Sequence, residues 1–139
     1  MSTGAIKKVV GKINIDVIDK DIVDKYDLKV YQNTAIIQDM NLYLHTYKNL
    51  KEFKTIDNYN YAIFNIDKII KDPYYVFYDN EKKSFLYFKE MNEDVCAVVK
   101  LNIKKNKDTY VSTLYPINKN KIQKYKNKEL MDKYIKNND

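Results

Sequence analysis

Hydrophobic positions change their spacing near the middle of the chain, from a period close to that of a helix to an alternation typical of strands. In the first half, apolar side chains recur every three or four residues, which predicts helices over residues 16–26, 35–50 and 59–71. Asn33 or Thr34 can cap the second helix, because a side-chain oxygen there can accept a hydrogen bond from a free backbone N–H. The apolar stripe expected on that helix comprises Ile36, Ile37, Met40, Leu44 and Tyr47.

The second half begins at Pro73, which disfavours helical geometry at the preceding residue and ends the third helix. Beyond it, short runs rich in β-branched and aromatic residues predict strands. The turns between these runs are short and so join antiparallel neighbours, because parallel strands need a long crossover. A last helix is expected over residues 120–135, which completes an α+β domain: N-terminal helices, a four-stranded antiparallel sheet and a C-terminal helix. The expected strands span residues 74–78, 84–89, 95–103 and 110–115.

Alternation along the strands assigns side chains to the two faces of the sheet. In the strand 95–103 every odd position is apolar and should meet the helices, so Lys100 and Asn102 point the other way. In the last strand Thr113 and Tyr115 share one face with Val111. A face that offers lysine, threonine, tyrosine and asparagine could hold a phosphate, although an ordinary solvated face has the same residue types. The face opposite Thr113 is expected to hold Tyr110, Ser112 and Leu114.

The composition fits one compact domain and excludes several classes of protein. A chain of 139 residues with 45% hydrophobic residues can bury a sizeable core. One cysteine and one histidine allow neither an internal disulfide nor a usual structural zinc site. Two glycines cannot build a P-loop or a dinucleotide-binding loop. No apolar run approaches the length of about 20 residues that a membrane span needs, and we expect no secretory signal.

The charge favours an anionic partner. The formal net charge is +6, and all 25 cationic residues are lysines. Nucleic acid is the usual partner of a basic domain, although the chain is also rich in asparagine and isoleucine, so lysine could be a compositional habit. The 14 tyrosines could stack on unpaired bases or could serve the core, which lacks tryptophan.

His45 is the residue of this chain best suited to proton exchange near neutral pH. It follows Leu44 at the edge of the expected apolar stripe, where it could reach over a neighbouring sheet. The alternative is a half-buried structural histidine. Nucleophilic catalysis by Cys96 is disfavoured, because this cysteine lies in the middle of a strand and the chain has no second histidine to activate it.

Three short motifs occur in a fixed order. Residues 30–37 read Val-Tyr-Gln-Asn-Thr-Ala-Ile-Ile and precede the helix with His45, residues 66–76 carry Ile-Ile-Lys-Asp-Pro into the sheet, and residues 111–115 read Val-Ser-Thr-Leu-Tyr. Over about residues 30–115 this order resembles the phage-associated branch of the barnase–EndoU–colicin–RelE nucleases. Such domains are often the C-terminal toxins of larger phage or polymorphic-toxin proteins. They often carry two histidines four positions apart, whereas this chain has Asn49 at the second position and Pro73-Tyr74 where they have Pro-Asp.

The resemblance implies one metal-independent ribonuclease domain over residues 1–139, without a cofactor. Its parts would be an N-terminal segment (1–30), a core (31–116) and a C-terminal helix (117–139). The RNA 2′-hydroxyl would attack the adjacent phosphate, with His45 as base or acid and Lys100 neutralising charge. Thr113, with Ser112, would donate a hydrogen bond, and Tyr115 or Tyr87 would transfer the second proton or stack on a base. The residues expected to contact substrate are Lys89, Tyr87, Ser112, Asn102 and Asn49.

Three hypotheses follow. The first is a ribonuclease toxin that acts on tRNA or another structured RNA in the cytoplasm of the producing or target cell. Its partner would be an immunity protein or antitoxin with an acidic face. The second is a catalytically silent relative that binds RNA or a protein, which Asn49 favours. The third is a phage structural or adaptor module, which would neither bind RNA nor be toxic.

Overall fold

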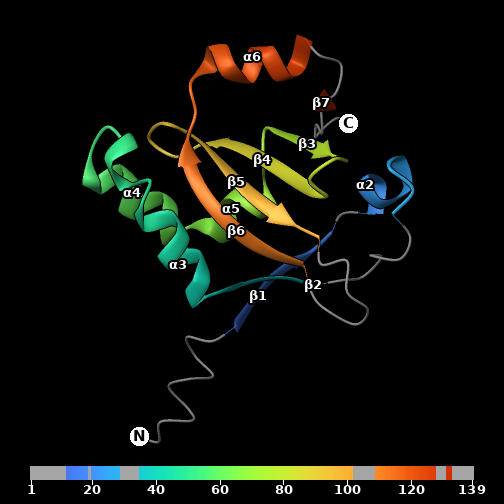
Figure 1. Ribbon diagram of the computed structural model, residues 1–139, viewed down its shortest axis with the longest axis horizontal. Coiled ribbons are helices and arrows are strands. Elements are labelled where there is room, and N and C mark those ends of the chain that lie inside the picture. The colour runs from blue at the N-terminus through green and yellow to red at the C-terminus, as the bar shows by residue number, and fades with distance from the viewer. Residues whose placement is uncertain (1–11, 19, 29–34, 102–108, 128–130, 133–139) are drawn as a thin grey trace, which may run out of the picture.

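The computed structural model describes residues 12–18, 20–28, 35–101, 109–127 and 131–132 (Figure 1). These residues form a mixed α+β fold, as the sequence predicts. The strands are β1 (Lys12–Val17), β2 (Ala35–Asp39), β3 (Tyr75–Asp79), β4 (Ser84–Glu90), β5 (Asp94–Lys100), β6 (Thr109–Pro116) and β7 (Met131–Asp132). The helices are α2 (Lys20–Lys25), α3 (Met40–Tyr47), α4 (Ile56–Ile63), α5 (Ile66–Lys71) and α6 (Lys119–Asn127), with a short 3₁₀ turn, η2 (Leu50–Glu52).

The sheet is larger than the predicted four strands. The described strands lie in the order β1-β2-β6-β5-β4-β3-β7. The expected antiparallel run is confirmed for β3 to β6, because short turns join β3, β4 and β5, and β5 pairs with β6. At one edge β2 pairs with β6 in parallel and with β1 in antiparallel fashion. The prediction that helices come first is therefore wrong for the described residues, whose first element is the strand β1.

The helix predicted over 35–50 is half strand and half helix. Ile36 and Ile37 are buried in β2, and the helix begins only at Met40. The predicted stripe is also wrong within α3, because Leu44 and Tyr47 are 68% and 67% exposed. The residues that α3 buries are Leu42 and Thr46, which are four positions apart and both 0% exposed. Strand pairing by the isoleucines outweighed the helical spacing, as tertiary context often does for short apolar runs.

The other helices differ from prediction mainly in their ends. The helix expected over 59–71 is broken at Phe64 and Asn65 into α4 and α5, and Thr55 caps α4 by accepting a hydrogen bond from the Asn58 N–H at 3.0 Å. The last helix ends at Asn127, well before residue 135. The proposed caps Asn33 and Thr34 lie outside the described residues.

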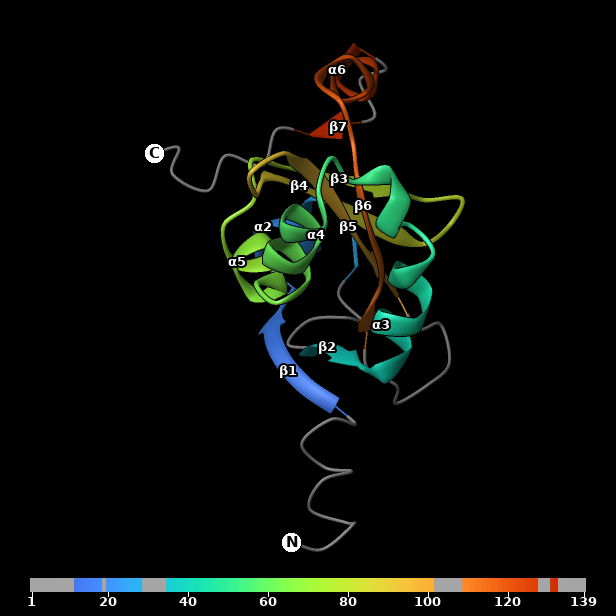
Figure 2. The same ribbon diagram turned by 90° about the vertical axis from the view of Figure 1, so that its left-hand side faces the viewer.

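The sheet separates two apolar clusters (Figure 2). The larger lies on the side of α2, α4 and α5, whose isoleucines and valines meet the inward face of the strands. The smaller lies on the other face, where α6 places Ile122 and Tyr125 over Phe77, Phe88 and Cys96. Among the described residues, no helix is long and apolar enough to cross a membrane. The face with the smaller cluster is therefore covered less completely than the other, and the candidate site lies on its uncovered part.

Candidate active site

A β-bulge in β6 decides which side chains reach the second face of the sheet. Along the β5–β6 pair, Val99 faces Val111 but Val98 faces Thr113, so Ser112 is an extra residue in the register. A bulge of this kind shifts the alternation by one position. Val111 and Leu114 therefore both belong to the larger cluster, and the predicted sharing of a face by Val111 and Thr113 is wrong.

The register confirms that Thr113 and Lys100 share the second face. Thr113 lies opposite Val98, and Lys100 is two residues further along β5 on the same side. Such diagonal neighbours have Cα atoms about 7 to 8 Å apart. Lys100 is exposed, and Thr113 is half-buried. Tyr110 lies opposite Lys100, so it joins this face, contrary to the alternation expected from the sequence.

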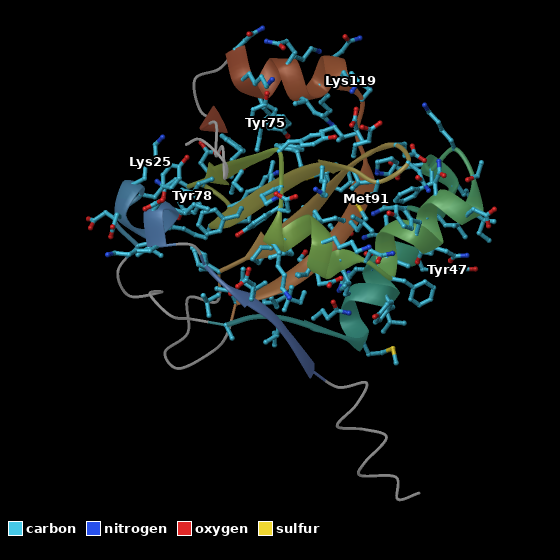
Figure 3. The ribbon with its side chains drawn as sticks, turned by 180° about the vertical axis from the view of Figure 1, so that it is seen from behind. Lys25, Tyr47, Tyr75, Tyr78, Met91 and Lys119 are labelled. Carbon is cyan, nitrogen blue, oxygen red and sulfur yellow. The ribbon has the colours of Figure 1, made fainter. Side chains whose placement is uncertain are left out.

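Helix α6 covers only part of this face. Tyr115 lies opposite Cys96, beneath the part of the sheet that meets α6. Tyr75 also lies between α6 and the sheet (Figure 3), with the Lys126 Nζ 3.9 Å from its ring centre. The distance from α6 along the sheet increases from Thr113 to Lys100 and Tyr110. We call the part of the face that carries these three residues the open half.

Helix α3 runs beside β6 and bonds to its edge (Figures 1 and 2). Strand β2 pairs with β6 at its first two residues, and α3 follows where β2 ends. The buried Thr46 hydroxyl accepts a hydrogen bond from the Leu114 backbone N–H at 3.1 Å. The Asn49 amide donates to the Leu114 carbonyl, also at 3.1 Å. Side chains of the helix therefore take the place of a neighbouring strand.

Asn49 also positions the hydroxyl of Thr113. Its Nδ2 donates to Thr113 Oγ1 at 3.2 Å. The bond to the Leu114 carbonyl fixes the orientation of the amide, because only the NH₂ group can donate there. Since one lone pair of Thr113 Oγ1 is occupied by this bond, the hydroxyl hydrogen is available to a group on the open half. Asn49 is thus a positioning residue for Thr113.

His45 is exposed in the last turn of α3. It precedes the buried Thr46 by one position and Asn49, which lies in the turn after α3, by four. Within the part of the chain that the structure describes, no hydrogen bond or ion pair involves His45. The alternative of a half-buried structural histidine is therefore wrong, and the imidazole is accessible to solvent.

Tyr115 is less suited to proton transfer than the sequence implies. Burial, followed by the nearby Cys96, raises the pKa of Tyr115 well above its ordinary value. Its hydroxyl forms a hydrogen bond with the Cys96 thiol, and burial raises the pKa of that thiol to about 12. Both groups therefore stay protonated near neutral pH. The exclusion of Cys96 as a nucleophile is consistent with this protonation.

Two predicted substrate contacts lie on the wrong face. Tyr87 pairs with Ala97 and is 3% exposed within the larger cluster. Lys89 pairs with Val95 on the same face, where its Nζ lies 2.6 Å from the Asp72 carbonyl oxygen and 3.3 Å from its carboxylate. Both side chains have structural contacts and face away from the open half. The sequence assigned them by residue type, which does not reveal the face.

A comparison with known families identifies the family to which the chain belongs. A family model described as phage-Barnase-EndoU-ColicinE5/D-RelE like nuclease3 matches residues 8–124. The chain belongs to this family of phage-associated nucleases. The resemblance expected from the order of its motifs is thereby confirmed. Neither the curated proteins nor the solved structures contain a significant match.

In this member of the phage-associated nuclease family, the remaining predicted residues are placed as follows. Ser112 is the half-buried bulge residue beside Thr113. Asn102 lies outside the described residues. Among the described residues there is no group of three or more histidine, cysteine, aspartate or glutamate side chains that could hold a metal ion.

A cavity of about 460 Å³ lies near the start of α6, at the far end from the open half. Its walls include the carboxylates of Glu52, Glu90, Glu93 and Asp94. Glu93 is buried and accepts hydrogen bonds from the Lys54 N–H and the Asn58 amide at 2.8 and 2.9 Å. Carboxylates at this density repel phosphate groups. The candidate site is therefore the open half with α3, and not this cavity.

Proposed function

We propose that this nuclease is a metal-independent endoribonuclease whose active site is the open half together with the end of α3. The observation that carries the proposal is the bond from Asn49 to Thr113, which holds a hydroxyl donor on the face where Lys100 is exposed. We infer that His45, in the last turn of α3 and four positions before Asn49, reaches the same face. The site thus combines a proton acceptor, a cation and an oriented hydroxyl in a chain of nuclease ancestry.

The proposed reaction is attack of the RNA 2′-hydroxyl on the adjacent phosphorus. His45 takes the proton of the 2′-hydroxyl as the bond from O2′ to phosphorus forms. The bond from phosphorus to O5′ breaks, and O5′ takes a proton from the Tyr110 hydroxyl. The products are a 2′,3′-cyclic phosphate and a 5′-hydroxyl end. DNA lacks the attacking 2′-hydroxyl, so this mechanism acts on RNA alone.

Lys100 and Thr113 would stabilise the charge that develops on the phosphate oxygens. Lysine acts as a point charge, and the Thr113 hydroxyl adds a directed hydrogen bond. Donors of this kind contribute about 10² to 10³ in rate when they are held in place. The net charge of +6 favours binding of the RNA backbone. Structured RNA such as tRNA is the proposed substrate, and an immunity protein with an acidic surface would inhibit the enzyme by covering Lys100.

The decisive experiment is incubation of purified protein with total RNA in the presence of EDTA. We expect fragments with 2′,3′-cyclic phosphate ends from the wild type and none from His45→Ala. A single-stranded DNA of matching sequence should remain intact. Cleavage by His45→Ala at the wild-type rate would rule out the proposed role of this histidine. Complete absence of cleavage by the wild type at any salt concentration would rule out the enzyme.

A second function is favoured by one specific observation. Both hydrogens of the Asn49 amide are engaged, by Thr113 and by Leu114, so this residue cannot replace the second histidine that family members often carry. A catalytically silent RNA-binding domain would retain the cationic face without cleavage. It would bind RNA with an affinity that falls steeply with salt, as counterion release requires, and would leave the RNA intact.

A further inference from the structure

A cavity of about 370 Å³ lies on the other side of α3, between the first two strands and helices α4 and α5. Its volume is in the range of small-ligand sites. The side chains of Gln38, Tyr43, Phe64, Asp67 and Lys71 line it, together with two buried isoleucines. None of these residues belongs to the open half. The cavity is therefore separate from the candidate active site.

Two aromatic rings give the cavity walls suited to a flat ligand. Phe64 is 74% exposed at the end of α4, although its neighbour Ile63 is 3% exposed in the core. The half-buried Tyr43 lies on α3 and lines the same cavity. A phenylalanine ring with this exposure contributes little to the core and is available to bind a ligand. Aromatic side chains commonly stack on unpaired bases.

The polar groups of the cavity complement the edge of such a ligand. Gln38 is 9% exposed, and its Nε2 donates to the Tyr43 hydroxyl at 2.9 Å, which ties the amide to the aromatic wall. Asp67 and Lys71 are exposed and one turn apart on α5. Neither takes part in an ion pair within the described ranges of the chain. A carboxylate, an amide and an ammonium group are thus available beside two rings.

We propose that this cavity binds an unpaired guanine base of an RNA strand. The base lies against Phe64 and Tyr43, and its N1–H and N2–H groups donate to the Asp67 carboxylate. Lys71 binds a neighbouring phosphate as a point charge. Guanine is chosen because its Watson–Crick edge presents two adjacent donors, which a carboxylate can accept together. The inference rests on the proposed function in taking RNA as the ligand.

The path from this cavity to the active site runs over the outer surface of α3. Tyr47 projects from that surface (Figure 3) and is 67% exposed. It is four positions after Tyr43, so both tyrosines lie on the cavity side of α3, whereas His45, two positions before Tyr47, points to the opposite side of the helix. The guanine would therefore be a nucleotide some distance along the strand from the cleaved phosphate, and would select the RNA without taking part in the reaction.

The test is a titration of ¹⁵N-labelled protein with GMP and AMP, followed by NMR. We expect GMP to shift the backbone signals of residues that line the cavity, and AMP to bind more weakly because adenine lacks the two adjacent donors that Asp67 would accept. Phe64→Ala should abolish the shifts, and Asp67→Asn should remove the preference for GMP. Ile56→Ala is the matched control, because Ile56 is 61% exposed at the opposite end of α4. Shifts away from the cavity, or shifts unchanged by Phe64→Ala, would overturn the proposal.

The same variants separate this inference from the proposed function. For a guanine-containing RNA oligonucleotide, Phe64→Ala should weaken binding about tenfold, whereas Ile56→Ala should keep the wild-type affinity. If the wild type cleaves RNA and Phe64→Ala has wild-type affinity, the base site is wrong and the nuclease stands. If GMP binds at the cavity but no RNA is cleaved, the base site stands and the nuclease is wrong. If the cavity binds a partner protein and neither GMP nor RNA, the proposed base site is wrong.

Discussion

The Asn49 amide nitrogen lies 3.2 Å from the Thr113 hydroxyl and joins two elements that are far apart in the sequence. The same nitrogen also donates to the Leu114 carbonyl. One side chain at the end of α3 thereby holds both the backbone of β6 and a hydroxyl on the open half. The fold and the proposed site share this contact, so changes to either residue should be separable by measuring stability and activity together.

Thr113→Val should lower the rate of RNA cleavage by about 10² to 10³ and the free energy of unfolding by about 0.5 to 1.5 kcal/mol, because it also removes the acceptor for Asn49 Nδ2. Valine keeps the shape of threonine and its β-branch but removes the hydroxyl donor. Single-turnover cleavage and urea unfolding would measure the two quantities. Ser112→Ala is the control, since it removes the neighbouring hydroxyl in the bulge. Equal losses in both variants would show that the bulge, and not the Thr113 hydroxyl, matters.

Asn49→Asp should destabilise the protein by about 1 to 3 kcal/mol, because both donors are lost and a carboxylate faces the Leu114 carbonyl. Asn49→Ala should cost less, since it introduces no repulsion. Denaturant unfolding would give both values. Activity should fall in each variant, as the Thr113 hydroxyl loses its fixed direction. An aspartate variant as stable as the wild type would contradict the assigned orientation of the amide.

Lys100→Gln should lower kcat/KM and reduce the salt dependence of RNA binding by about one unit of slope. Lys100 is exposed, so the free energy of unfolding should hardly change. Lys20→Gln is the matched control, because Lys20 is exposed on α2 and belongs to neither proposed RNA site. The measurement is binding at several salt concentrations. A change of the same size in Lys20→Gln would indicate a nonspecific charge effect.

Stability should fall at alkaline pH because of Cys96. Burial raises the pKa of this thiol from 9.0 to about 12, so the folded state keeps a proton that the unfolded state releases. The stabilisation is present below pH 9 and is lost as the pH rises toward 12. Unfolding by urea between pH about 8 and about 10.5 would measure the slope. Cys96→Ala should show a shallower decline, and an identical decline would contradict the assignment.

The antiparallel run from β3 to β6 could be predicted from the sequence because its turns are short and local. Strands β1 and β2 could not, since β1 pairs with residues 18 to 27 positions away and the isoleucines of β2 also fit a helical spacing. Helix α3 was placed with the wrong face inward, because its buried Thr46 is polar and owes its burial to a bond with β6.

For the candidate site, residue type and alternation led to Lys100, Thr113 and His45. The bulge at Ser112 could not be read from the sequence, which has no glycine or other signal there. As a result Tyr110 was assigned to the wrong face and missed. Tyr87 and Lys89 were included because aromatic and cationic residues suit RNA, yet the register turns both toward the helices.

The bonds from Thr46 and Asn49 to Leu114 have a consequence for the behaviour of the chain in concentrated solution. A strand edge with free N–H and C=O groups can pair with another copy of the protein, and natural proteins protect such edges. Here the side chains of Thr46 in α3 and of Asn49 in the turn after it occupy the edge of β6 at Leu114. Variants of Asn49 would therefore also expose the edge of β6, which could then pair with another copy of the protein. Residue 49 is thus constrained by solubility as well as by the proposed catalysis.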